Sequence, residues 1–128
     1  MLSETQVKEF AADWVRAWNG HDLDAILSHY APEIELTSPV AVRLLNDSSG
    51  TVRGPMALRQ YFRRGLETYP NLAFELLEVM WGLSSVILRY KNQKGSTTCE
   101  YMELDARMKV TRVVANYSSE DKAAVERD

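Results

Sequence analysis

The sequence predicts a single α+β domain, because helical patterns fill the first half of the chain and strand patterns fill the second. Apolar side chains recur every three or four residues within 7–18 and again within 58–66, which is the period of a helix with one buried side. Strand-like runs follow between residues 72 and 117. With no internal repeat and no linker, we assign residues 1–118 to one domain and 119–128 to a polar C-terminal tail.

Composition narrows the classes of function. Hydrophobic residues are 45% of the 128 and charged residues 26%, which is typical of a globular protein with its own core. A net charge of −3 gives no reason to expect nucleic acid or an anionic membrane as partner. One cysteine and two histidines exclude an internal disulfide and a metal site rich in these residues, so we expect no metal and no cofactor. The sequence shows no signal peptide and no run that would cross a membrane, which predicts a cytoplasmic protein.

The first helix is predicted between Ser3 and Gly20. Ser3 precedes the helical pattern, and Gln6 stands three residues later as the partner in a capping box. Asn19 and Gly20 both tolerate the left-handed conformation that ends many helices. The side chains expected to be buried share one stripe: Val7, Phe10, Ala11, Trp14, Ala17 and Trp18.

A second, short helix is predicted over residues 23–30, capped by His21 or Asp22 and ended by Pro32. Residues 33–37 then alternate between polar and apolar, which indicates a half-buried strand. This strand is the first place where the pattern changes from helix to sheet.

The segment from residue 39 to 54 is compatible with a strand, a lid or part of a dimer contact. Residues 46–50 are turn formers, and 51–53 are a candidate return strand. Pro55 opens the last of three predicted helices, at the position that proline favours. The buried side chains expected on this helix are Leu58, Tyr61, Phe62, Gly65 and Leu66.

The remaining runs are predicted to form an antiparallel meander, because the connections between them are short. The predicted strands cover residues 72–81, 84–91, 96–104 and 109–117.

This order of elements, with four short motifs in it, resembles the SnoaL-like and ketosteroid-isomerase-like branch of the nuclear transport factor 2-like superfamily. The motifs are WNGHDLDAIL at 18–27, HYAPEIE at 29–35, GPMALRQYF at 54–62 and KVTRV at 109–113. The resemblance covers residues 4–117. It implies a cystatin-like α+β cone, in which a curved, mostly antiparallel (mixed) sheet wraps around the long first helix and an apolar pocket lies at the open end. It also implies a homodimer through the outer sheet face.

The positions that carry catalysis in the steroid isomerases are altered here. The general-base aspartate of that family falls at Ser38, whose hydroxyl is no base near neutral pH without a partner group. The oxyanion tyrosine falls at Val15, and a supporting tyrosine falls at Phe62, beside Tyr61. A second supporting tyrosine is kept as Tyr30. These departures argue against steroid isomerisation by that mechanism.

One acidic position matches the family in altered form. Counting back from the motif at 109–113, the protonated pocket aspartate of the family aligns with Glu100. On a strand, Glu100 shares a face with Met102 and Leu104. A carboxyl on an apolar concave face has its charged form disfavoured, so it stays neutral and can donate a proton. In the alternative, Tyr101 faces the pocket and Glu100 lies in solvent.

Other pocket residues are expected on the last strand and the helices. Alternate residues of 113–117 share the face that lines the pocket in the family, and the Tyr117 hydroxyl is a candidate donor to a ligand carbonyl. Trp14, Trp18 and Tyr61 are candidate aromatic walls, although at helical spacing such residues are more often core. The candidate catalytic residues are Glu100, Tyr117 and Tyr30, and the candidate ligand-binding residues are Trp14, Val15, Trp18, Ser38, Tyr61, Phe62, Met102, Val113 and Ala115.

Three functions are compatible with these residues. The first is a cofactor-independent isomerase, cyclase or lyase that acts by acid–base chemistry on an apolar carbonyl compound through Glu100. The second is a non-catalytic module that binds an apolar small molecule. The third is an interaction module that dimerises through its outer sheet face, with Trp81, Ile87 and Tyr101 in the interface. An open cavity that holds Glu100 and a tyrosine hydroxyl favours the first.

Overall fold

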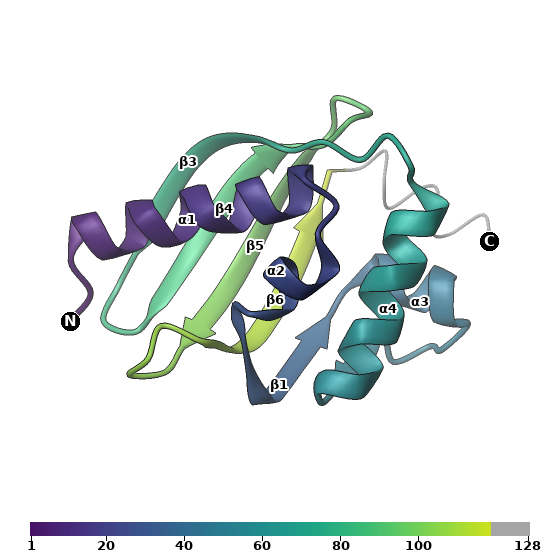
Figure 1. Ribbon diagram of the computed structural model, residues 1–128, viewed down its shortest axis with the longest axis horizontal. Coiled ribbons are helices and arrows are strands. Elements are labelled where there is room, and N and C mark those ends of the chain that lie inside the picture. The colour runs from purple at the N-terminus through teal and green to yellow at the C-terminus, as the bar shows by residue number, and fades with distance from the viewer. Residues whose placement is uncertain (119–128) are drawn as a thin grey trace.

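Six strands form one curved sheet in the computed structural model, which describes residues 1–118 (Figure 1). The last four strands form the predicted antiparallel meander, and β1 pairs in parallel with β6, so the sheet is mixed. Its order is β2-β1-β6-β5-β4-β3. The strands are β1 (Tyr30–Thr37), β2 (Thr51–Arg53), β3 (Glu75–Trp81), β4 (Ser85–Lys91), β5 (Thr97–Leu104) and β6 (Val110–Tyr117). The predicted tail, residues 119–128, lies outside the described residues.

Helix α1 (Glu4–Asn19) lies across the concave face of the sheet, in front of β3, β4 and β5 (Figure 1). Ser3 caps the helix as predicted, because its hydroxyl accepts from the Gln6 amide while the Gln6 side chain accepts from the Ser3 amide. Every side chain predicted for the buried stripe is at most 8% exposed. This apolar stripe holds the helix against the sheet.

The second helix is shorter than predicted. Helix α2 (Leu23–Leu27) begins at the Asp22 cap, but Tyr30 already belongs to β1 and pairs with Val110 of β6. Pro32 therefore lies inside the strand instead of ending the helix. The pairing register shifts between Tyr30 and Glu35, and proline is tolerated in such an irregular stretch because no ladder hydrogen bond is required of it.

Residues 39–45 form a helix, so four helices are present in residues 1–118 where the sequence predicted three. Helix α3 (Pro39–Leu45) was expected to be a strand or a lid, because the β-branched Val40 and Val42 favour strands. Its ends explain the difference. The Ser38 hydroxyl accepts from the Val40 amide at 3.2 Å, and Asn46 closes the helix in the left-handed conformation. These caps override a weak strand preference over seven residues.

Helix α4 (Pro55–Thr68) begins at Pro55 as predicted and packs against β1 and β2 together with α3 (Figure 1). Of the residues predicted to be buried on it, Leu58, Tyr61 and Phe62 are buried, whereas Gly65 and Leu66 are half-buried. No helix within residues 1–118 is long and apolar enough to span a membrane.

Candidate small-molecule site

On the concave face, side chains that pair across β4, β5 and β6 form three rows, and these rows differ in polarity. The deepest row is apolar, the middle row carries one carboxyl group, and the row nearest the sheet end carries three hydroxyl groups. Across β4, β5 and β6, these rows are Val86–Met102–Val113, Leu88–Glu100–Ala115 and Tyr90–Thr98–Tyr117.

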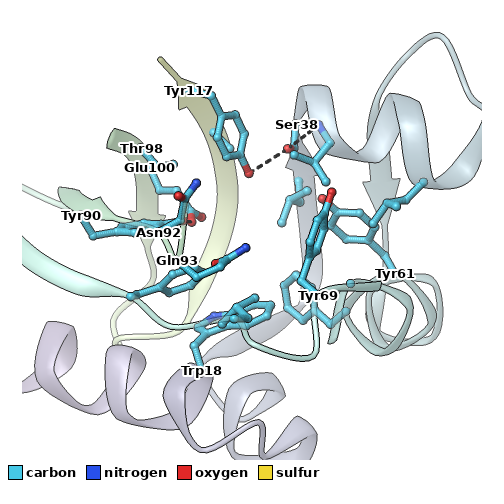
Figure 2. A pocket seen from close by; sticks show the side chains of 18 of the residues that line it. Trp18, Ser38, Tyr61, Tyr69, Tyr90, Asn92, Gln93, Thr98, Glu100 and Tyr117 are labelled. Atoms are coloured by element: carbon cyan, nitrogen blue, oxygen red, sulfur yellow. Dashed lines mark hydrogen bonds between the residues drawn. The ribbon is translucent and has the colours of Figure 1, made fainter. Parts of the chain in front are cut away.

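The middle row, apart from Leu88, and the row nearest the sheet end line a cavity of about 110 Å³ that lies between the sheet and helices α1, α3 and α4 (Figure 2). This volume is several times the roughly 10–15 Å³ that one ordered water needs. The lining reaches the surface at Lys94, which is exposed. Eight of the 21 described residues that line it are aromatic: Trp18, Tyr30, Tyr61, Phe62, Tyr69, Phe74, Tyr90 and Tyr117.

Glu100 is the only acidic side chain among the described residues that line this cavity. It is 7% exposed, and burial raises the pKa of its carboxyl to about 7 because the charged form loses its water. Its neighbour Tyr101 takes the opposite face, where its hydroxyl donates to Glu103 Oε2 at 3.0 Å. The concave side therefore carries Glu100 and the alternative with Tyr101 in the pocket is wrong.

A hydrogen bond from Tyr90 holds the Glu100 carboxyl in place. The Tyr90 hydroxyl donates to Glu100 Oε2, and this bond lowers the pKa of Glu100 while burial raises it by more. Tyr90 pairs with Thr98 and Glu100 pairs with Leu88, so the two side chains are diagonal neighbours on adjacent strands. The sequence analysis missed Tyr90 and Thr98. The period of two along a strand assigns Tyr90 and Thr98 to a face of the sheet. Which side chains lie next to them on the neighbouring strand depends on the pairing register, which the sequence analysis did not predict.

Ser38 and Tyr117 form a second polar group on the cavity wall (Figure 2). The Ser38 hydroxyl donates to the Tyr117 hydroxyl at 3.4 Å and also caps α3. Tyr61 lies beside Ser38, and burial raises the pKa of Tyr61 well above its usual range. The position of the family base therefore carries a hydroxyl that serves as a helix cap and as a neutral donor.

Ala115 separates the two polar groups. It pairs with Glu100, and Ser38 continues β1 beyond Thr37, which pairs with Val114, so Ser38 extends the row that contains Ala115. The small side chain of Ala115 leaves the space between Ser38 and Glu100 open to the cavity.

Tyr30 lines the cavity with its hydroxyl engaged. Trp14 Nε1 donates to the Tyr30 hydroxyl at 3.0 Å, and burial raises the pKa of Tyr30 well above its usual range. At neutral pH this group is therefore a neutral, oriented hydroxyl and not a base.

Four of the candidate ligand-binding residues lie outside the lining of the cavity. Trp14 is 1% exposed and stacks on Phe74, which separates it from the cavity. Met102 and Val113 belong to the deeper apolar row. Val15 follows the buried Trp14 by one residue and so points about 100° away from it around the helix. The remaining candidates lie on the cavity wall: Glu100, Tyr117, Tyr30, Trp18, Ser38, Tyr61, Phe62 and Ala115.

Phe74 is a wall residue that the sequence analysis did not select. Its ring packs on Trp14, Trp18 and Tyr90, with centroid distances of 4.3–5.7 Å. The Asn19 amide group holds the Phe74 backbone from both sides, since Asn19 Nδ2 donates to Phe74 O at 2.9 Å and Phe74 N donates to Asn19 Oδ1 at 2.7 Å. Asn19 was predicted only as a helix end. Its partner is 55 residues away, which no local pattern reveals.

Residues 1–118 contain no group of three or more His, Cys, Asp or Glu side chains arranged to hold a metal ion. The chemistry available to this site is that of one carboxyl group, several hydroxyl groups and an aromatic wall.

The sheet and the cavity together define a class of protein: an α+β fold with a curved mixed sheet and a pocket between the concave face of that sheet and its helices. The model of the SnoaL-like domain matches residues 11–127, so the chain belongs to the SnoaL-like family. The resemblance drawn from the motifs and the predicted α+β fold class are thereby confirmed.

Solved structures share this fold. A SnoaL-like protein of unknown function from Burkholderia thailandensis is 35% identical, with a TM-score of 0.87 over 91% of this chain and 98% of that one. An NTF2-like protein of unknown function from Burkholderia pseudomallei is 13% identical, with a TM-score of 0.74 over 97% of this chain and 98% of that one. TerC, co-crystallised with polyporic acid, is 13% identical, with a TM-score of 0.72 over 94% and 98%. No curated protein sequence matches the chain significantly.

Proposed function

We propose that this protein binds a small, largely apolar carbonyl compound in the cavity and moves a proton on it through Glu100. The observation that carries this proposal is a buried carboxyl group with a pKa of about 7 on an aromatic cavity wall. An acid–base group works best when its pKa lies near the operating pH, because both protonation states are then populated. The proposal places the protein with cofactor-independent isomerases, cyclases or lyases.

The proposed chemistry is proton transfer at the carbon next to a carbonyl group. The ionised Glu100 carboxylate takes the proton, the electron pair of the C–H bond forms a double bond to the carbonyl carbon, and the π pair of the carbonyl group moves onto oxygen to give an enolate. Glu100 then returns the proton to the same carbon or to a conjugated one. The ligand neither gains nor loses electrons overall, so the step requires no oxidant or reductant.

Hydroxyl groups on the opposite wall are suited to stabilise the enolate oxygen. The Ser38 hydroxyl donates a hydrogen bond to the Tyr117 hydroxyl on that wall, and a phenol that accepts one hydrogen bond is a stronger donor to a ligand oxygen. Donors fixed in advance around a developing negative charge are the usual means of lowering such a barrier. Tyr90 complements them by occupying Glu100 Oε2, which leaves the other carboxyl oxygen to carry the transferred proton.

The fold neighbours are consistent with a small-molecule ligand. TerC, which shares this fold, was co-crystallised with polyporic acid. A protein that bound its ligand without turnover would need the aromatic walls but not a carboxyl group with a neutral pKa. The position of Glu100 therefore favours the enzyme over the non-catalytic binding module.

Deuterium exchange tests the proposal. The ketone 2-tetralone has exchangeable protons next to its carbonyl group, and NMR in D₂O follows their replacement. The wild-type protein should accelerate the exchange, and Glu100→Gln should remove about 100-fold or more of that acceleration, as is usual for a general base. Glu103→Gln changes the same residue type on the outer face of β5 and should keep the activity. Equal rates for the wild-type protein and Glu100→Gln would contradict the proposal.

We also propose that two copies of the chain associate through the outer sheet face. The register places Met80, Ile87, Tyr101 and Val114 in one row across four strands of that face, and Met80 is 45% exposed. The predicted contribution of Trp81 is wrong, because Trp81 pairs with the buried Val86 and lies on the concave side.

Sedimentation velocity tests this association. A dimer is expected for the wild-type chain and a monomer for Ile87→Glu, because a charge would then be buried in the apolar row. A monomeric wild-type chain would contradict the proposal.

A further inference from the structure

Two polar atoms on the cavity wall are buried without a hydrogen-bond partner: Trp18 Nε1 and Thr98 Oγ1. Trp18 is 8% exposed and Thr98 is 1% exposed. A buried polar group that is left unpaired is costly, and most such groups in folded proteins find a partner. The cavity that both residues line is where a partner for them would sit.

The two neighbouring tryptophans of α1 differ in this respect, because the indole N–H group of Trp14 has a hydrogen-bond partner in the described part of the protein and that of Trp18 has none there. Trp14 Nε1 donates to the Tyr30 hydroxyl at 3.0 Å. Trp18 lies close enough to the same hydroxyl to lower the pKa of Tyr30, but its Nε1 does not reach hydrogen-bond geometry. The indole N–H group only donates, so its partner must be an acceptor. Thr98 Oγ1 can donate or accept.

The two atoms belong to different walls of the cavity. Trp18 comes from α1, and Thr98 comes from β5, two residues before Glu100 on the same face. Figure 2 shows Trp18 on the helix side and Thr98 beside Glu100 on the sheet side. A ligand with a single oxygen at the Glu100 side would leave the Trp18 donor unpaired.

We propose that Trp18 and Thr98 determine specificity by binding oxygen atoms on two opposite edges of a rigid ring ligand. Thr98 acts beside Glu100 on one edge, and the Trp18 N–H group binds an acceptor on the other edge. This inference rests on the proposed function, because it requires a ligand in this cavity. It adds that the ligand carries two separated oxygen functions.

Two naphthols of similar shape test the inference by calorimetry. Naphthalene-2,6-diol carries oxygen on both edges, whereas 2-naphthol carries it on one. The wild-type protein should bind the diol about five- to tenfold more tightly, as expected for one additional hydrogen bond in a buried site. Thr98→Val, which keeps the side-chain shape, should weaken both ligands, whereas Trp18→Phe, which removes the N–H donor, should abolish the difference between them. Thr97→Val is the matched control on the outer face and should keep both affinities.

The indole N–H signals give a readout that does not require a variant to fold. The chain has three tryptophans, and binding of the diol should shift the N–H signal of Trp18 and leave that of Trp14 in place. Equal affinities for the two naphthols, or an unmoved Trp18 signal, would overturn the inference and leave water as the partner of these atoms. The deuterium-exchange assay with a mono-ketone does not depend on this result, so the two proposals fail separately.

Discussion

Tyr90 and Glu100 lie on adjacent strands as diagonal neighbours, and the Tyr90 hydroxyl donates to the Glu100 carboxyl inside the cavity wall. Burial raises the pKa of both groups, and the negative charge of Glu100 raises that of Tyr90 further. Near neutral pH the pair therefore holds at most one negative charge, on Glu100. This relationship gives the site its acid–base character.

The pKa of Glu100 predicts how stability depends on pH. The folded-state pKa of about 7 lies above the ordinary value of 4.5, so the folded protein binds the proton more tightly than the unfolded chain. The contribution of Glu100 to the free energy of unfolding is then fully present below pH 4.5 and is lost as the pH rises to 7. The loss is on the order of 3 kcal/mol.

Glu100→Gln removes this dependence, since the amide carries no charge to bury. Urea unfolding at pH 5 and pH 8 should show the variant gaining stability relative to the wild-type protein at the higher pH. Glu103→Gln should follow the wild-type protein at both values. A constant difference between Glu100→Gln and the wild-type protein across this range would refute a raised pKa.

Tyr90→Phe removes the hydrogen bond that lowers the pKa of Glu100 and keeps the ring that buries it. The pKa of Glu100 should therefore rise above 7 in this variant. The pH midpoint of ketone exchange should move upward with it. A midpoint that stays in place or moves downward would show that the hydrogen bond does not influence the carboxyl group.

Asn19 fixes one cavity wall by holding the Phe74 backbone through two hydrogen bonds. Asn19→Ala should lower the free energy of unfolding by about 1–3 kcal/mol, because two backbone groups lose their partner. It should also weaken the binding of 2-naphthol, since Phe74 lines the cavity. Asn116→Ala, at an exposed position of β6, is the control and should change neither quantity. Unchanged binding of 2-naphthol by Asn19→Ala would show that the hydrogen bonds between Asn19 and Phe74 do not contribute to the binding site.

Ala115→Leu should fill the space between Glu100 and Ser38. The larger side chain should reduce binding of 2-naphthol about tenfold or more and cost about 1–3 kcal/mol of stability through overpacking. Calorimetry and thermal unfolding measure the two effects. Val114→Leu adds a methylene group on the outer face and should leave binding unaltered. Normal binding by Ala115→Leu would mean that ligands do not occupy this part of the cavity.

The sequence predicted those parts of the fold that depend on local signals. The Ser3–Gln6 capping box, the buried stripe of α1 and the antiparallel meander are set by residues close together in the chain. Helix α3 was missed because Val40 and Val42 favour a strand, whereas Ala41, Arg43, Leu44 and Leu45 and the caps at Ser38 and Asn46 favour a helix.

The candidate site was predicted in part for the same reason. Period-two alternation grouped Glu100 with Met102 and Leu104 on one face but left open whether that face or the face of Tyr101 lines the pocket, and the structure shows that Glu100 does. Tyr90 and Thr98 reach the same site only through the pairing of β4 with β5, and Phe74 only through Asn19. The places of these three residues in the site are determined by contacts between residues far apart in the chain. Such contacts could not be inferred from the local patterns of one sequence.

The most direct test of the account is a ¹³C NMR titration of the Glu100 side-chain carboxyl group, assigned by comparison with Glu100→Gln. A midpoint near pH 7 is predicted, because the wall that holds Glu100 excludes water from its charged form. A midpoint near the ordinary value of 4.5 would contradict the account, because the carboxylate would then be a weak base with a pKa far below the operating pH and its wall would not disfavour the charged form.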